Sequence, residues 1–459
     1  MSKKNNKTIF YCKECGYESA KWLGQCPSCN SWNSFVESEN LESINISTGN
    51  LISQKDLKPL EIKTLNEIDS KKEERFKTGI GEFDNLLGGG IVKGSLTLIG
   101  GAPGIGKSTL LLQVVQKIGN SGQNVLYVSG EESLEQIKLR ALRLGEFNNN
   151  VKFLSDTNMD AILMTIIKTK PDLIIIDSIQ TMALNIEDKI PGSITQVRAT
   201  TQSIFRVCKE YNISAFIVGH ITKEGNVAGP KLLEHIVDVV LYFEDDIETN
   251  LRILRCKKNR FGSADTIAVF EMQSSGLREI KNPSEIFVNN KDRTDTIGCT
   301  ITCIIESNRP ILIEVQSLVT KSNFGMARRN INGADLNRLN LLIAIIEKRM
   351  NLPLYQYDIY VNITGGFKIK DPSIDLAIIM AILSSYKEKQ IGNDCVYCGE
   401  VGLSGEVRNV SYANLRVQEA VKLGYKKIFL PKSNVDSIDE NMLKKYNGIE
   451  IKGIKDVVN

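Results

Sequence analysis

The segment from residue 101 to residue 109 constrains the fold of this chain more than any other stretch. It matches the pattern G-x-x-x-x-G-K-S/T in full, with an apolar run at 96–99 before it and a helical pattern at 110–115 after it. A glycine-rich turn between a strand and a helix directs backbone N–H groups at the oxygens of a polyphosphate. The sequence therefore predicts a nucleoside triphosphate site, whose binding residues are Gly101, Ala102, Pro103, Gly104, Ile105, Gly106, Lys107, Ser108 and Thr109.

An acidic residue at the end of a later apolar run extends this site. From residue 76 the chain alternates strand and helix patterns, and the run at 173–176 is apolar throughout, as in a strand buried on both faces of a parallel sheet. Asp177 ends this run, where parallel sheets bind their ligands. Asp177 is therefore predicted to orient Mg²⁺ together with the Ser108 hydroxyl, while Lys107 contacts the β- and γ-phosphates.

Two adjacent glutamates follow another predicted strand, at 124–129. A carboxylate one strand away from the phosphate loop can orient and deprotonate the attacking water, so Glu131 or Glu132 is a candidate catalytic base. The alternative is that both charges only favour the N-terminus of the helix predicted at 134–142. The residues alone leave this choice open.

Composition bounds the class of protein. A chain of 459 residues with 42% hydrophobic and 24% charged residues is expected to form two or three soluble domains. It has no apolar run near the ~20 residues of a membrane span and no secretory signal, so a cytoplasmic location with reduced thiols is expected. A net charge of +3 does not indicate a nucleic-acid partner, which would need local basic patches.

Four of the ten cysteines lie in the first 29 residues, in the spacing C-x₂-C-x₁₀-C-x₂-C. Two such pairs can close a tetrahedron of thiolates around Zn²⁺, and four protein ligands leave no open position for catalysis. A redox pair or unrelated thiols are the alternatives. The predicted ligands of a structural zinc finger are Cys12, Cys15, Cys26 and Cys29.

Several motifs together resemble the bacterial RadA (Sms) family. They are the four-cysteine module, the phosphate loop, the Val-Ser-Gly-Glu-Glu-Ser and Ile-Ile-Asp-Ser-Ile-Gln strings, and Lys-Asn-Arg-Phe-Gly at 258–262. The resemblance runs from Cys12 to the C-terminus. It implies a RecA-like ATPase of homologous recombination, DNA repair and transformation, which moves branched intermediates along DNA as a ring-shaped hexamer.

The same resemblance implies roles for individual residues. Glu131 matches the catalytic glutamate, and His220, after the apolar run 215–219, matches the residue that senses the γ-phosphate. Lys258 and Arg260 resemble a finger that reaches the site of the neighbouring subunit, and residues two apart on a strand do face the same way. A solvated basic strand end is the alternative. The candidate DNA-binding residues are Lys223 and Lys231 in the polar loop after His220, together with Lys258 and Arg260.

The last third of the chain resembles a Lon protease domain, which raises the possibility of a Ser–Lys peptidase. Ser373 falls near the position of the nucleophile, but the alignment places Asn414 at the position of the lysine, and an amide cannot act as the base. Ser373 is instead expected in the first turn of a helix that Asp371 caps. Candidate basic DNA contacts here are Lys321, Arg328, Arg329 and, more weakly, Arg416, and buried free thiols are expected at Cys299, Cys303, Cys395 and Cys398.

The sequence thus predicts an α/β RecA-like P-loop ATPase core, an N-terminal four-cysteine zinc finger and a C-terminal α+β Lon-protease-like domain without peptidase activity. The expected boundaries are 1–36 for the zinc finger, 37–75 for a linker, 76–282 for the ATPase and 283–459 for the Lon-like domain. The expected protein is a hexameric, DNA-dependent, helicase-like ATPase that uses ATP, Mg²⁺ and Zn²⁺. It promotes branch migration on single-stranded and branched DNA, and its zinc finger contacts a RecA-type recombinase. The competing functions are an ATP-dependent Lon-like peptidase, a KaiC-like regulatory ATPase without DNA contact, and an ATP-gated adaptor that does not hydrolyse ATP.

Overall fold

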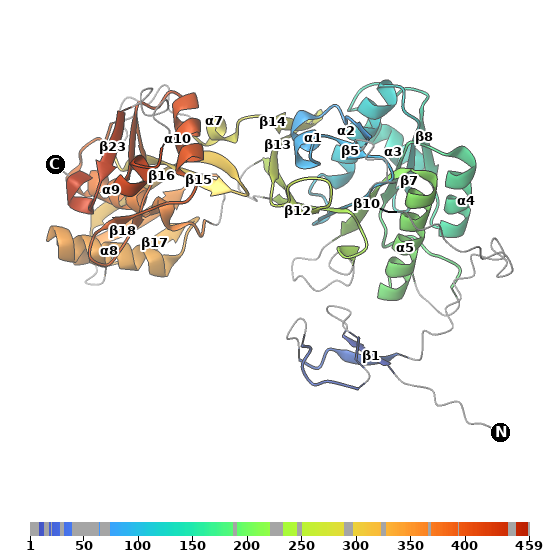
Figure 1. Cartoon of the computed structure of the whole chain (residues 1–459), viewed down its shortest axis with the longest axis horizontal. Helices are drawn as coiled ribbons and strands as arrows, with labels where there is room; N and C mark the ends of the chain where they lie inside the picture. Colours follow the sequence, from blue (N-terminus) through green and yellow to red (C-terminus); the bar gives the residue numbers. More distant parts are fainter. Residues whose placement is uncertain are drawn as a thin grey trace. The chain divides into compact units, whose positions relative to one another are not determined.

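The chain forms two compact units (Figure 1). The first unit comprises Met1–Glu244, Leu254–Ala264 and Met272–Arg278, and the second comprises Asp245–Ile253, Asp265–Glu271 and Glu279–Asn459. The computed structural model describes residues 9–12, 18–19, 21–27, 32–38, 64, 74–186, 191–220, 233–245, 250–288, 297–322, 327–365, 369–392, 394–438 and 447–457.

The N-terminal segment forms a small antiparallel sheet of three strands in the order β2-β1-β3. Its strands are β1 Ile9–Cys12, β2 Glu18–Ser19 and β3 Phe35–Ser38. Its core is very small within the described residues, whose buried apolar cluster consists of Cys12, Cys26 and Phe35. A core of this size is typical of a module that needs a metal for its stability.

A nine-stranded sheet carries the phosphate loop, in the order β14-β13-β12-β11-β6-β10-β9-β7-β8. The strands from β11 to β8 in this order pair in parallel, and the four from β6 to β7 are buried almost throughout, as expected for a sheet covered on both faces. These strands are β6 Leu96–Gly101, β7 Val125–Ser129, β8 Val151–Ser155, β9 Leu173–Asp177, β10 Ser214–His220, β11 Val239–Asp245, β12 Leu251–Asn259, β13 Ile267–Gln273 and β14 Gly276–Ile280.

Helices cover this sheet and supply its core. The apolar faces of α4 and α5 pack on β6, β7, β9 and β10 in one large cluster that includes Ile162, Ile166 and Ile204. The helices are α1 Gly81–Leu86, α2 Lys107–Asn120, α3 Leu134–Ala141, α4 Met159–Thr169 and α5 Ile194–Tyr211, and a short hairpin pairs β4 Arg75–Phe76 with β5 Ile91–Val92. Among the described parts of the chain, no helix is both long and apolar enough to cross a membrane.

The start of α2 depends on a glycine. Gly106 has φ of 117°, in the left-handed region, and a Cβ there would lie 2.9 Å from Cε of Met272. A side chain at this position would therefore strain the backbone and displace the flexible end of Met272 on β13. The glycine lets the chain turn sharply from β6 into α2, with Lys107 as the first helical residue.

The second unit is built on a seven-stranded sheet in the order β17-β18-β16-β15-β19-β22-β23. Helix α9 is buried along most of its length, between the sheet and α8, in the largest apolar cluster. The strand pair expected at 297–305 and 311–319 is present as β15 and β16, and the expected helix at 339–350 belongs to α8. The principal elements are α7 Pro283–Phe287, β15 Cys299–Glu306, β16 Arg309–Lys321, β17 Arg329–Asn332, α8 Leu336–Met350, β18 Tyr357–Ile363, α9 Asp375–Lys387, β19 Cys395–Tyr397, β20 Glu400–Val401, β21 Val407–Arg408, α10 Ala413–Lys422, β22 Lys427–Pro431, α11 Lys432–Val435 and β23 Asn447–Ile451.

Candidate functional site

The carboxyl ends of four neighbouring parallel strands meet at one edge of the nine-stranded sheet. The register pairs Gly101 on β6 with His220 on β10, and Ser129 on β7 with Asp177 on β9. Strands β9 and β10 are themselves neighbours. Residues that lie far apart in the sequence are therefore brought to the phosphate loop by the pairing of the sheet.

A pocket of about 420 Å³ opens at this edge. The phosphate loop, the segment after β7, the C-terminal end of α3 and the β13–β14 turn contribute to its walls. The described residues that line it are Pro103, Gly104, Gly106, Lys107, Ser108, Thr109, Glu131, Glu132, Arg140, Arg143, Leu144, His220, Met272, Gln273, Ser274 and Gly276. Most of the predicted nucleotide-binding residues thus lie on one pocket, together with Arg140 and Arg143, which the sequence did not single out.

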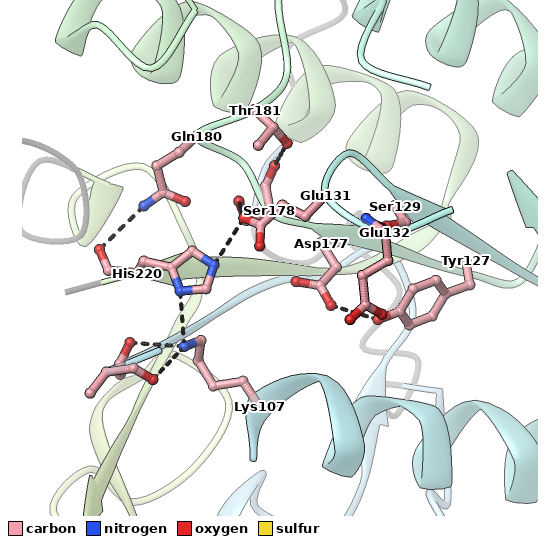
Figure 2. Close-up of polar contacts among 12 residues, drawn as sticks. Lys107, Tyr127, Ser129, Glu131, Glu132, Asp177, Ser178, Gln180, Thr181 and His220 are labelled. Atoms are coloured by element: carbon pink, nitrogen blue, oxygen red, sulfur yellow. Dashed lines mark hydrogen bonds and ion pairs between the residues drawn. The ribbon is translucent and has the colours of Figure 1, made fainter. Parts of the chain in front are cut away.

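Lys107 is almost fully buried at the base of the pocket. Its Nζ donates hydrogen bonds of 2.9 Å to the carbonyl oxygens of Gly101 and Ala102 and lies 3.2 Å from Nδ1 of His220 (Figure 2). Burial lowers the pKa of Lys107 to about 8, although the nearby carboxylates of Asp177 and Glu131 favour its charged form. The amine is therefore held at the loop, where it can neutralise phosphate charge.

The two adjacent glutamates lie in different surroundings. Oε1 of Glu131 lies 3.0 Å from Nε2 of His220 and accepts a hydrogen bond from the Ser178 hydroxyl (Figure 2). Both glutamates line the pocket, but only Glu131 contacts the histidine that reaches Lys107. Glu132 forms an ion pair with Arg140 on α3 instead. This geometry supports Glu131 rather than Glu132 as the candidate catalytic base.

Asp177 ends β9 and is held by a partner that the sequence did not reveal. The Tyr127 hydroxyl, buried on β7, donates a hydrogen bond of 2.6 Å to Oδ2 of Asp177 (Figure 2). Burial first, and then the charge of Asp177, raise the pKa of Tyr127, so the phenol remains a donor. Gln180 was also missed, although it lies in the quoted Ile-Ile-Asp-Ser-Ile-Gln string, and its Nε2 donates a hydrogen bond to the backbone oxygen of His220 at 3.3 Å.

Lys258 and Arg260 are not among the described residues that line the pocket of their own chain. Nζ of Lys258 donates to the carbonyl oxygens of Glu234 and Val237 at 2.6 and 2.8 Å, and Arg260 pairs with Asp238 at 3.3 Å. Burial, followed by the charge of Arg260, lowers the pKa of Lys258. The predicted DNA-binding residues Lys223 and Lys231 lie outside the described residues.

The N-terminal sheet brings together two of the four predicted zinc ligands. Cys12 at the end of β1 and Cys26, directly after the bridge residue Gln25, are both fully buried in the same small cluster. Two buried thiols in one cluster fit the thiolate chemistry of a structural zinc, which Cys12 and Cys26 would hold with two further ligands. The other two predicted ligands, Cys15 and Cys29, lie outside the described residues.

Comparisons with known proteins agree with this domain order. A family profile described as AAA domain matches residues 62–226, one described as rubredoxin metal binding domain matches 10–37, and one described as subunit ChlI of Mg-chelatase matches 320–434. DNA repair protein RadA from Streptococcus pyogenes serotype M1 is 48% identical, over 100% of this chain and 98% of the relative. DNA repair protein RadA from Bacillus subtilis (strain 168) is 46% identical, over 98% and 97%. The chain belongs to the RadA family.

Membership in the RadA family confirms the fold class predicted from the sequence. The RadA-family chain combines a P-loop AAA domain, an N-terminal zinc ribbon and a C-terminal Lon-like domain. The AAA domain and the phosphate loop in its described pocket make the chain an ATPase. DNA repair protein RadA from Listeria monocytogenes serovar 1/2a is 45% identical over 95% of the chain and 94% of the relative.

One prediction for the Lon-like domain is wrong. Arg416 was expected as a weak DNA contact, but it is 1% exposed on α10. Its guanidinium donates to the Ser373 hydroxyl oxygen at 2.9 Å, to Asp371 at 2.6 Å and to the carbonyl oxygen of Cys303. Its Nε also donates to the carbonyl oxygen of Ser411 at 2.8 Å. A guanidinium with four acceptors around it is a buried structural group and is unavailable to a DNA phosphate.

The same contact shows which side chain of α10 reaches Ser373. The side chain that meets Ser373 is Arg416, whereas Asn414 is exposed on the same helix. Arg416 cannot act as a general base, because a guanidinium stays protonated in proteins. Burial would lower the pKa of Arg416, but its hydrogen bond and ion pair with Asp371 keep that pKa above the ordinary value. Asp371 caps the turn and accepts the backbone N–H of Ser373, as predicted.

Three cysteines of this domain, Cys303, Cys395 and Cys398, are buried free thiols, as predicted. Cys299 is only half-buried at the start of β15. Burial raises the pKa of Cys303 and Cys398 above their usual range. These thiols therefore remain protonated and behave as small apolar side chains.

Proposed function

We propose that this RadA-family ATPase is a DNA-dependent motor of DNA repair and homologous recombination, which promotes branch migration of single-stranded and branched DNA intermediates. The observation that carries the proposal is the convergence of Lys107, Glu131 and His220 beside the phosphate loop. A motor of this kind requires a group that detects the γ-phosphate and couples hydrolysis to movement. His220 suits this role because it ends β10, directly before the polar, glycine-rich sequence 221–231.

Hydrolysis follows from the chemistry of the residues at this edge of the sheet. Lys107, Ser108 and Asp177 would hold Mg-ATP, with Tyr127 fixing the Asp177 carboxylate. Glu131 orients a water molecule and takes its proton as the γ-phosphate is attacked. Lys258 and Arg260 of a neighbouring subunit stabilise the charge that develops on the phosphate. Each site then needs a residue pair from the next subunit, so the proposed active assembly is a ring, which we assign as a hexamer.

DNA contacts come from basic residues in both units. Lys223 and Lys231 belong to the polar sequence that follows His220. In the Lon-like domain, β16 and β17 flank β18, and these two strands carry Lys321, Arg328 and Arg329 at or near their ends. Such cations contribute salt-dependent contacts to phosphates without reading the sequence.

The domain boundaries of the proposal are 1–36, 37–75, 76–282 and 283–459. In this proposal the zinc finger binds a partner protein, which we assign as a RecA-type recombinase. The Lon-like domain serves as a platform for assembly and DNA binding rather than as a peptidase, because Arg416 occupies the position from which a base would reach Ser373.

The proposal is tested by the ATPase rate with and without single-stranded DNA, in the wild-type protein and in Lys258→Ala. DNA is expected to stimulate the wild-type rate, and Lys258→Ala to remove most of the stimulated rate. A rate that neither DNA nor the substitution changes would contradict the motor. Binding to single-stranded DNA that weakens with salt would in turn exclude a regulatory ATPase without DNA contact.

A further inference from the structure

A buried carboxylate lies directly behind Arg260. Asp238 is 2% exposed, and its Oδ1 accepts from a terminal nitrogen of Arg260 at 3.3 Å. Its Oδ2 accepts from Nζ of Lys209 at 2.8 Å and from the backbone N–H of Leu96 at 3.1 Å. A buried carboxylate is stable only when it is paired in this way, so its position is closely determined by its neighbours.

The backbone of Asp238 ties Arg260 to the central sheet. The N–H of Asp238 donates to the carbonyl oxygen of Leu96 at 2.9 Å, and the N–H of Arg260 donates to the carbonyl oxygen of Asp238 at 3.2 Å. Leu96 begins β6, the strand that runs into the phosphate loop. Both the backbone and the side chain of Arg260 are thus fixed, through one residue, to the strand that carries the chain's own nucleotide site.

Lys258 docks on the same short segment. Its Nζ contacts the carbonyl oxygens of Glu234 and Val237, only a few residues before Asp238. The Glu234 carboxylate accepts a hydrogen bond of 2.6 Å from the Tyr242 hydroxyl on β11, which anchors the segment to the sheet. The segment 234–238 therefore holds both cations of the Lys-x-Arg pair.

We propose that Asp238 is a positioning residue for Arg260, which acts in the hydrolysis site of the neighbouring subunit. This inference rests on the finger role given to Arg260 under the proposed function. The Arg260 side chain is 51% exposed, and Asp238 engages one terminal nitrogen, so other N–H groups of the guanidinium can face a phosphate. Because stabilisation of a transition state depends on accurate placement, a fixed guanidinium acts better than a freely rotating one.

Asp238→Asn provides the direct test, since the amide keeps the shape and an acceptor for the Leu96 N–H but loses the charge. We expect kcat for DNA-stimulated hydrolysis to fall about tenfold, which is less than the rate loss from removing an arginine finger itself. The KM for ATP and the affinity for a fluorescent ATP analogue should stay within about twofold of wild type. In an Arg260→Ala background, Asp238→Asn should cause no further loss. Lys209→Gln is the matched control, because it removes the other cation from Asp238 and should leave kcat within about twofold.

The kcat values of these variants distinguish the finger role of Arg260 from the positioning role of Asp238. If Arg260→Ala retains wild-type turnover, the finger role in the proposed function is wrong. If Arg260→Ala is slow while Asp238→Asn is normal, or if the double variant is slower than Arg260→Ala alone, the positioning role of Asp238 is overturned and the finger role stands. Thermal unfolding checks that each variant is folded. If Asp238→Asn is unfolded, Asp238→Glu is measured in its place. A reduced kcat of Asp238→Glu at unchanged ATP affinity then supports the positioning role, and a full kcat overturns it.

Discussion

Nε2 of His220 lies 3.0 Å from Oε1 of Glu131. The other nitrogen of the same ring lies 3.2 Å from Nζ of Lys107, so the imidazole connects the candidate base with the lysine of the phosphate loop. A ring in this place can exchange one of these partners for a phosphate oxygen, because each nitrogen donates or accepts according to its tautomer. This arrangement distinguishes Glu131 from its neighbour in the sequence.

Glu131→Gln is expected to slow ATP hydrolysis by about 10²- to 10³-fold while ATP binding is retained, since an amide cannot take a proton from water. Phosphate release measures the first effect and a fluorescent ATP analogue the second. Glu132→Gln is the control, because Glu132 pairs with Arg140 and should change the rate less than about fivefold. Equal losses in the two variants would remove the distinction between the glutamates.

Tyr127→Phe is expected to raise the Mg²⁺ concentration needed for half-maximal ATPase activity by about tenfold. The Tyr127 hydroxyl holds Oδ2 of Asp177 at 2.6 Å, and loss of a group that orients a metal-binding carboxylate typically weakens metal affinity by 10- to 100-fold. Titration of Mg²⁺ at saturating ATP measures the effect, and saturating Mg²⁺ should restore most of the rate. An unchanged Mg²⁺ requirement would show that Tyr127 only packs in the core.

The sequence predicts those parts of the site that depend on residues close together in the chain. The phosphate loop and the acid that ends β9 depend on local spacing, and both lie where the pattern placed them. The contact between Lys107 and His220 depends on strand order instead, because the pairing of β6 with β10 brings together residues 113 positions apart. Tyr127 could not be assigned from the sequence, since a tyrosine in an apolar strand gives no indication of which group its hydroxyl meets.

The position of Arg416 could have been inferred from helical periodicity. The buried residues of α10 include Ala413, Arg416, Val417 and Ala420, which share the spacing of one helix face. The expectation that an arginine faces solvent led to the wrong prediction. Three of its four acceptors come from Asp371, Ser373 and Cys303, which are distant in the sequence and cannot be recognised before the fold is known.

Arg416→Met is expected to lower the free energy of unfolding of the Lon-like domain by about 3 kcal/mol, because it leaves a partly buried Asp371 without its cation. Ser373→Ala should cost about 1 kcal/mol and leave the ATPase rate unchanged. Chemical denaturation followed by circular dichroism measures both.

Arg408→Met on β21 is the control, since Arg408 is 58% exposed and its ion pairs should contribute less than about 1 kcal/mol. Cleavage of a peptide substrate that depends on Ser373 would contradict the structural role.

Removal of zinc is expected to unfold the N-terminal sheet while the basal ATPase rate stays within about twofold of wild type. Both tryptophans of the chain lie in this module, and Nε1 of Trp22 donates to the carbonyl oxygen of Phe35, which packs with Cys12 and Cys26. Chelation, or Cys26→Ser, should therefore shift tryptophan emission to longer wavelength as one zinc per chain is lost, because four-thiolate modules of this size depend on their metal. Cys208→Ser in α5 is the control and should keep both the zinc and the emission spectrum. A Cys26→Ser protein that retains a full equivalent of zinc, or emission that does not respond to chelation, would contradict the zinc assignment.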